Sequence, residues 1–165
     1  RYISPPQLEA VHLGKKILCH RPMRHGSPSF SINQVGNKYI IDNYGHGGSG
    51  WTLAPGAAQY VIKLLQEKAE TDLKKDREIT IVGAGAIGLF MALELVSQGY
   101  KNVKVVAEKF DNLTSHNAGG LIAPVSMDND PDLQKIVDKI GIDAYRFFAE
   151  VAKGKHPIIK AGAVI

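Results

Sequence analysis

EITIVGAGAIGLFMALEL, residues 78–95, is the stretch of sequence that decides the fold. It opens with β-branched residues typical of a buried strand and passes through a glycine-rich turn into an apolar segment of helical length. The turn spells G-x-G-x-x-G with Gly83, Gly85 and Gly88. Between a strand and a helix, this pattern predicts a turn that binds a dinucleotide.

Each part of this turn has its own physical task in that prediction. The first glycine permits the tight turn, the second lets the backbone approach a pyrophosphate, and the third lets the helix pack closely on the strand. The helix that starts at Ala86 and Ile87 would offer free N–H groups and a partial positive charge to the phosphates. Glu108, twenty residues after Gly88, would accept hydrogen bonds from the ribose hydroxyls.

A second glycine-rich turn lies earlier in the chain, in NKYIIDNYGHGGSGWTLAPGAAQYVIKLL, residues 37–65. It also reads as a strand, a cluster of glycines and a helix with apolar residues at helical spacing. We expect Pro55 to be the first residue of this helix and Thr52 to be its cap. The sequence therefore holds two turns of the same kind, which raises the question of why both are present in this order.

The elements around the two turns are predicted from composition and turn residues. Residues 15–32 predict a strand broken by Pro22 and then a loop, and this segment would form a hairpin with residues 38–45 around Gly36 and Asn37. Residues 66–78 are the most polar stretch and predict a solvated helix end and a linker. The later elements are expected as a helix ended by Gly99, a strand at 101–110, a loop at 111–131, a helix at 130–154 with Gly141 as a candidate break, and a strand at 156–165.

Composition excludes several classes of protein. The 165 residues carry a net charge of +4, but the basic residues are scattered and interleaved with acids, so we expect no nucleic-acid binding. Cys19 is the single cysteine, which leaves no intrachain disulfide. There is no hydrophobic run of membrane-spanning length and no signal-peptide core at the first residues, so we expect no membrane partner and a cytoplasmic location.

The segment VKVVAEKFDNLTSHNAGGLIAPVSMDNDP, residues 103–131, resembles the matching segment of the D-amino acid oxidase family. The resemblance implies that the dinucleotide is FAD, and that the fold is α/β, a Rossmann-like FAD-binding domain with a parallel sheet core. The implied contacts are Glu108 and Lys109 at the adenosine, Thr114 and Ser115 at the phosphate and ribitol, and Gly120 and Leu121 near the flavin.

The earlier turn is similar to the signature near the C-terminus of the same family, through IIDNYGHGGSGWTLAPGAA at residues 40–58. In the family this turn passes close to the flavin ring, and the helix after it points its N-terminus at the edge that becomes anionic on reduction. Gly48 would offer its carbonyl to the substrate amine. The residues that would line the flavin are Gly47, Gly48, Ser49, Gly50, Trp51 and Thr52.

CHRPMRHGSP, residues 19–28, also resembles a family segment, in which an arginine binds the substrate carboxylate. Arg21 matches that arginine, and its planar guanidinium suits two parallel hydrogen bonds to a carboxylate. Arg24 matches a second basic position. His46 invites a general-base role, but its place in a tight turn favours a structural hydrogen bond instead. The remaining histidines lack metal-ligand spacing, so we expect no metal site.

The order of the two turns is explained by a circular permutation. In the family the dinucleotide turn comes first and the NYGHGG turn comes last, whereas here residues 1–65 match the C-terminal segment, residues 66–78 are the linker and residues 79–165 match the N-terminal segment. The family's substrate-binding domain has no counterpart in these residues. We therefore expect the 165 residues to be part of a longer oxidase, silent in catalysis when alone and prone to form a homodimer.

The function implied is FAD-dependent oxidation of an amino acid, in the D-form, to an imino acid, by hydride transfer to the flavin. Three alternatives stay open at this point: a glycine, sarcosine or other amine oxidase, a dehydrogenase that passes electrons to a carrier, and a module that binds FAD without catalysis. The NYGHGG spelling and the HRP sequence favour the D-amino acid branch.

Overall fold

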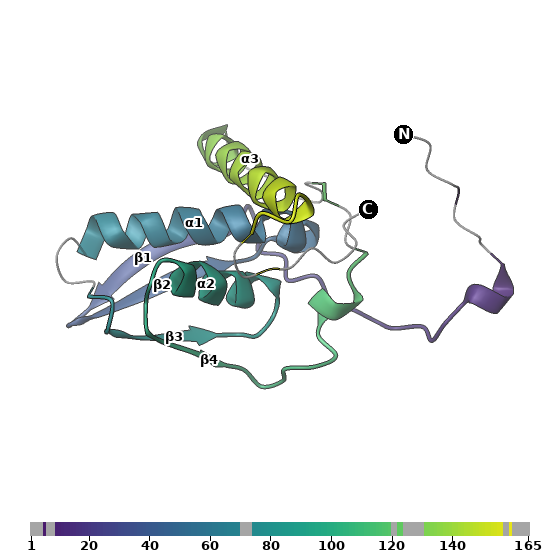
Figure 1. Ribbon diagram of the computed structural model, residues 1–165, viewed down its shortest axis with the longest axis horizontal. Coiled ribbons are helices and arrows are strands. Elements are labelled where there is room, and N and C mark those ends of the chain that lie inside the picture. The colour runs from purple at the N-terminus through teal and green to yellow at the C-terminus, as the bar shows by residue number, and fades with distance from the viewer. Residues whose placement is uncertain are drawn as a thin grey trace.

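The computed structural model describes residues 5, 9–69, 74–119, 122–123, 131–156 and 159. It contains two pairs of strands and three long helices (Figure 1). One pair is antiparallel and the other is parallel. The protein is therefore of mixed α/β class, as the sequence predicts.

The parallel pair is the βαβ unit that the G-x-G-x-x-G stretch predicts. Strand β3 (Glu78–Val82) leads into helix α2 (Ala86–Ser97), which returns to strand β4 (Asn102–Val106). In the parallel register Glu78 pairs with Asn102 and Val82 with Val106. The helix ends as expected, since Gly99 adopts a left-handed φ of 86° and the Tyr100 N–H reaches back to the Leu95 carbonyl.

The antiparallel pair is a hairpin of β1 (Ser29–Val35) and β2 (Lys38–Tyr44), with Gly36 and Asn37 in the turn. The turn is the predicted one, but the first strand is not where it was expected. Residues 15–21 form no strand and are exposed. Strand β1 instead begins at Ser29, within the part of residues 15–32 that was expected to be loop, and it pairs along its whole length. Packing decides the outcome, because Phe30 of β1 lies against the buried cluster around Val61, and the 15–21 segment meets no such surface.

Helix α1 (Gly50–Ala69) differs from the expectation at its start. It begins five residues before Pro55 and follows a short 3₁₀ turn, η2 (Gly47–Ser49), so Pro55 lies inside the helix and Thr52 is not its cap. A proline inside a helix is unfavourable because it lacks an N–H and crowds the preceding turn. Here Thr52, Leu53 and Ala54 are buried, and burial of this first turn outweighs that cost.

Helix α1 is the centre of the molecule. Figure 1 shows α3 (Pro131–Ala152) crossing one side of α1, with the hairpin, α2 and the parallel strands on the other. The core has two clusters that share α1, one formed with α2 and one with α3. The α2 cluster is Ala58, Val61, Ile62, Met91, Leu95 and Tyr100, and the α3 cluster is Leu53, Ala57, Val137 and Ile140.

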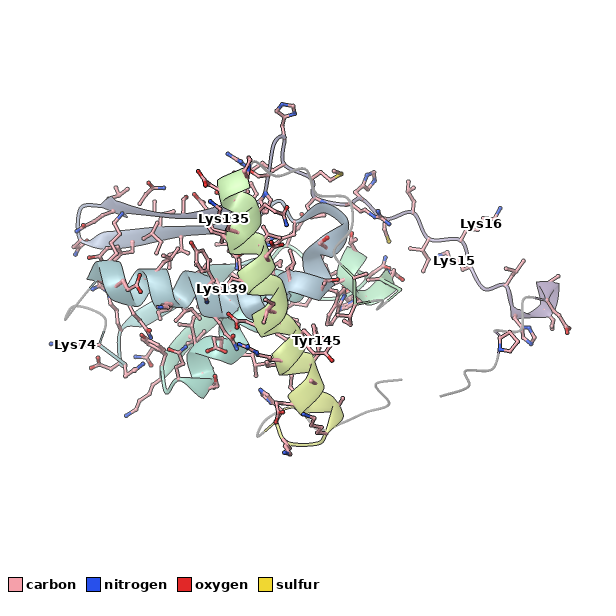
Figure 2. The ribbon with its side chains drawn as sticks, turned by 90° about the horizontal axis from the view of Figure 1, so that it is seen from above. Lys15, Lys16, Lys74, Lys135, Lys139 and Tyr145 are labelled. Carbon is pink, nitrogen blue, oxygen red and sulfur yellow. The ribbon has the colours of Figure 1, made fainter. Side chains whose placement is uncertain are left out.

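The crossing of α1 and α3 is close because of a glycine. A Cβ atom added to Gly56 would lie 2.0 Å from the Ile140 carbonyl oxygen, so only glycine fits there. Gly141, a candidate break in α3, does not interrupt the helix. Figure 2, viewed from above, shows α3 lying over α1 with Lys135, Lys139 and Tyr145 labelled along it.

The ends of the described chain are less compact. Residues 9–22 run away from the helices as an extended arm with one 3₁₀ turn, η1 (Ala10–His12), and Figure 2 shows Lys15 and Lys16 on this arm. The strand expected at 156–165 falls almost wholly outside the described residues. Within the part that is described, no helix is long and apolar enough to cross a membrane.

Candidate functional site

The dinucleotide turn has the geometry its glycines predict. Gly83 adopts a φ of 109°, and its N–H donates to the Val106 carbonyl at 2.8 Å, which ties the turn to the end of β4. A Cβ atom on Gly88 would lie 2.0 Å from the Gly83 carbonyl oxygen. Helix α2 therefore packs directly on the end of β3, at a distance that no side chain at position 88 allows.

The start of α2 offers N–H groups to a ligand. The first helical hydrogen bond runs from the Leu89 N–H to the Gly85 carbonyl at 3.0 Å, so the N–H groups of Ile87 and Gly88 have no acceptor within the helix. The Ala86 N–H donates to the Ser115 hydroxyl oxygen at 2.9 Å. The same hydroxyl would lie 3.3 Å from a Cβ atom on Gly85. A side chain at Gly85 would thus fill the space between this helix start and Ser115.

Glu108 lies near the same end of the parallel sheet. Because Val82 pairs with Val106, strands β3 and β4 end at the same edge of the sheet. The chain continues there toward Gly83 after β3 and toward Glu108 after β4. Glu108 and Lys109 are both exposed. This edge, at the carboxyl ends of parallel strands, is where ligands bind in open α/β sheets.

The NYGHGG turn meets the dinucleotide turn through one segment, the 3₁₀ turn η4 (Thr114–Asn117). The indole N–H of Trp51 donates to the Ser115 carbonyl at 2.8 Å. The Trp51 ring also contacts Phe90 of α2 edge to face, with centroids 5.8 Å apart. Ser115 therefore bonds to the helix start of each turn, through its carbonyl to α1 and through its hydroxyl to α2.

A second link comes from Thr52, the next residue of α1. Its hydroxyl donates to the Ala123 carbonyl at 2.8 Å and accepts from the Ala123 N–H at 3.1 Å. Both bonds go to one residue of the segment that comes after η4 in the sequence. The start of α1 is thus tied to two points of the loop that the sequence assigns to the cofactor.

The Arg21 segment docks on the same turn. The Gly47 N–H donates to the Pro22 carbonyl at 3.2 Å, and Met23 forms an isolated antiparallel bridge with His46. On the other side, the Thr114 hydroxyl donates to the His20 carbonyl at 3.2 Å. The backbone around Arg21 is therefore fixed between η4 and the NYGHGG turn, while Arg21 itself is exposed.

The remaining expected contacts divide into two groups. Ser49 is fully buried, and Gly47, Gly48 and Gly50 are half-buried around it. Gly120 and Leu121, expected near the flavin, lie outside the described residues. The structure thus brings residues 20–23, both glycine turns and η4 together. It does not test the positions expected for Gly120 and Leu121.

His46 does not make the structural hydrogen bond that was expected. Its side chain is 2% exposed, and neither ring nitrogen has a partner among the described residues. The ring instead packs edge-on against Phe30, with centroids 5.5 Å apart. Burial away from water lowers the pKa of His46 from 6.5 to about 4, so the imidazole is neutral near pH 7.

Asn43 shares this unusual state. Both polar atoms of its side chain are buried, and they have no partner in the described part of the chain. Buried polar groups in folded proteins usually have hydrogen-bond partners. Within the described ranges, burying the side chains of Asn43 and His46 without them therefore costs free energy at this turn. No group of histidine, cysteine, aspartate and glutamate that could hold a metal ion is found among the residues described.

Sequence reasoning assigned Trp51 only a backbone role and missed its side chain. The one signal available was that the single tryptophan of the chain immediately follows the glycine cluster. The link between Thr52 and Ala123 was also missed, because it joins residues 71 positions apart.

A comparison with protein-family models identifies the βαβ unit and the residues after it. The model described as DAO, FAD dependent oxidoreductase, matches residues 78–163, which is slightly more than half of the chain. The match begins at the first residue of β3 and includes the G-x-G-x-x-G turn, Glu108 and η4. No curated protein and no solved structure matches the chain significantly. The chain belongs to the DAO family of FAD-dependent oxidoreductases.

Proposed function

We propose that this chain binds FAD where its two glycine turns meet, and that it serves the oxidation of an amino acid, most readily a D-amino acid. The observation that carries the proposal is Ser115, which bonds to the start of α2 through its hydroxyl and to Trp51 of α1 through its carbonyl. A turn that binds a pyrophosphate and a turn that faces a flavin must lie together if one dinucleotide is to span both. The family match supports the cofactor.

The residues present fit FAD. The N–H groups of Ile87 and Gly88 and the positive end of α2 would hold the pyrophosphate. Glu108, at the same sheet edge, would accept hydrogen bonds from the ribose. Gly85 leaves open the space that a Cβ atom would fill beside Ser115.

At the other turn the chain would bind and orient the substrate. Bound FAD supplies the hydride acceptor for the chemistry. The start of α1 would present its positive end to the flavin edge that gains negative charge. The Gly48 carbonyl would accept a hydrogen bond from the substrate amine, and Arg21 would hold the carboxylate through two hydrogen bonds.

The permuted order of the two turns belongs to the same proposal. Both segments contribute to one site, and helix α1 packs on α2, so a short linker between them is physically reasonable. The substrate-binding domain would then be supplied by residues outside these two segments. A module that binds FAD but turns over no amino acid is the competing function, and flavin binding without amino-acid turnover in the full-length natural protein would favour it.

Flavin binding tests the first half of the proposal. The wild-type protein should bind FAD in a fluorescence titration, and Gly85→Val should lose that binding because its side chain enters the pyrophosphate space. Gly141→Ala is the matched control, since its Cβ atom would meet only Leu53 at 3.8 Å. Full FAD binding by a folded Gly85→Val protein would contradict the assignment.

Arg21→Ala tests the second half, in the full-length natural protein. It should keep FAD and lose kcat/KM for amino acids by about 30-fold or more, because a desolvated carboxylate would be left unpaired. Arg21→Lys should recover only part of the loss. An amine substrate without a carboxylate is the control and should be nearly indifferent. Equal losses for both substrates would mean that Arg21 supports the fold or the flavin instead.

A further inference from the structure

Trp51 is the single tryptophan of the chain and the second residue of α1. Its side chain is half-buried and leaves its own turn to reach the other one. The indole N–H donates to the Ser115 carbonyl, 64 residues away in sequence, and the ring packs edge to face on Phe90 of α2. One side chain thus contacts both the helix and the loop of the dinucleotide turn.

Ser115 receives the other half of this arrangement. Its hydroxyl oxygen accepts the Ala86 N–H at 2.9 Å, at the start of α2. A serine hydroxyl can accept two hydrogen bonds and donate one. No residue in the described part of the chain accepts the hydrogen of this hydroxyl, so the hydrogen is available to an anionic ligand at the helix start.

The segment that carries Ser115 needs external support to hold this position. It is a 3₁₀ turn of four residues with no buried side chain. Isolated short helices of this kind are weak, because their hydrogen bonds have poor geometry. The bonds from Trp51 and Ala86 fix Ser115 at its carbonyl and at its hydroxyl oxygen, and the Ala86 bond turns the hydroxyl hydrogen away from that N–H.

We propose that Trp51 is a positioning residue for the cofactor phosphates. Its indole holds the Ser115 backbone so that the Ser115 hydroxyl, oriented by the Ala86 N–H, keeps a donor directed at a phosphate beside the start of α2. This inference rests on the proposed FAD function and adds to it a side-chain link between the two turns. The link makes phosphate affinity at one turn depend on the other turn.

The test is a double-mutant cycle on FAD affinity. Trp51→Phe keeps the ring and removes the N–H, Ser115→Ala removes the hydroxyl, and the third variant carries both changes. Trp51→Phe should weaken the Kd for FAD by about 3- to 10-fold, the effect of one neutral hydrogen bond, and Ser115→Ala by about 10-fold or more, because its hydroxyl donates to a charged phosphate. The double variant should bind no more than about 2-fold more weakly than the weaker single variant, because Trp51 acts through Ser115.

Controls separate positioning from general support of the fold. Ser115→Thr keeps a hydroxyl and should bind FAD within about 2-fold of wild type. Phe90→Leu removes the ring contact with Trp51 but leaves the indole hydrogen bond, and should change the Kd less than Trp51→Phe does. Thermal unfolding followed by circular dichroism checks that each variant is folded. Losses that multiply in the double variant would overturn the inference and leave the FAD proposal intact.

A measurement on the wild-type protein tests the same link without any substitution. The single indole N–H gives one resonance in an ¹⁵N spectrum, and its hydrogen exchange reports how often the bond to Ser115 opens. Since coupling is reciprocal, FAD should slow this exchange by the same factor of about 3 to 10 by which the bond strengthens FAD binding. An exchange rate that is unchanged at saturating FAD would overturn the inference. A wild-type protein that binds no FAD would overturn both this inference and the proposed function.

Discussion

The two glycine turns share one pattern but differ in what fills the space around their helix starts. At the start of α1, the turn is packed by protein: His46, Ser49 and Thr52 are buried, and the Thr52 hydroxyl is bonded to Ala123. At the start of α2, Ala84 and Ala86 are buried, but Gly83, Ile87 and Gly88 stay partly exposed and Val82 just before them is 85% exposed. The same local pattern therefore builds one closed turn and one open turn.

The difference shows that a glycine-rich pattern determines the path of the backbone. It does not determine which groups fill the space around the start of the helix. Glycines in the open turn make room for the helix to pack on β3, as the Gly88 contact with the Gly83 carbonyl shows. In the closed turn, polar groups are buried by neighbouring segments, including residues 20–23. Substitutions and pH should therefore act differently on the two turns.

The largest effect is expected at the open turn, from Gly88→Ala. Its Cβ atom would lie 2.0 Å from the Gly83 carbonyl oxygen, so helix α2 must move away from β3. We expect the free energy of unfolding to fall by about 4 kcal/mol or more, or the protein not to fold, in urea unfolding followed by circular dichroism.

Gly50→Ala is the matched substitution at the closed turn. Gly50 has helical backbone angles, and a Cβ atom there would meet nothing within 4 Å. The added methyl group should raise the free energy of unfolding by up to about 1 kcal/mol. Similar losses for both variants would show that the two turns do not differ in this way.

A smaller effect is expected from the pH dependence of the closed turn. The pKa of His46 is lowered to about 4 in the folded protein. Between pH 6.5 and pH 4 this histidine is therefore protonated in the unfolded chain and neutral in the folded chain. The contribution of His46 to the free energy of unfolding is fully present above pH 6.5. It falls by about 3 kcal/mol in total as the pH falls from 6.5 toward 4. The open turn, from Ile81 to Phe90, has no titratable side chain.

His46→Leu isolates this contribution, since leucine has similar volume and does not titrate. The unfolding free energies of both proteins should be measured between about pH 7.5 and pH 4, which spans the two pKa values of the histidine. The gap between them should shift in favour of the variant as the pH falls. A gap that is constant over this range would mean that the His46 pKa is not lowered.

The smallest loss of stability is expected from Thr52→Val, which keeps the shape and removes the hydroxyl. Two hydrogen bonds to Ala123 are lost, and both Ala123 backbone groups are left without this partner. The free energy of unfolding should fall by about 1–2 kcal/mol, measured by urea unfolding. No change would show that water replaces the hydroxyl, and that the closed turn is more open than its burial indicates.

The sequence was sufficient for the βαβ unit because its signals are local. The glycine spacing, the β-branched strand and Gly99 all lie within one short stretch, and they predict β3, α2 and β4. The first strand of the hairpin was misplaced because residues 15–21 have the composition of a strand but no surface to pair with. The start of α1 was also predicted wrongly, at Pro55. The helix begins before the proline because Thr52 and Leu53 are buried in its first turn.

For the candidate site, motif residues were found and the links between them were not. Ser115 was expected at the phosphates from the family resemblance, and it does lie at the start of α2. That Trp51 reaches it could not be read from the chain, because the two are far apart in sequence and the bond uses a backbone carbonyl. His46 was expected to find a hydrogen-bond partner, and a sequence gives no measure of how completely a turn excludes water.

Helix α1 has a consequence for how the molecule opens. Both core clusters contain α1 residues, and Gly56 brings α3 against its backbone, so we expect the two clusters to open together. The amides of Leu53, Val61 and Ile62 should then exchange with solvent at nearly one rate, that of the slowest opening of the protein. Both glycine turns would be lost in a single cooperative event, and a ligand bound at either turn would slow exchange along the whole helix.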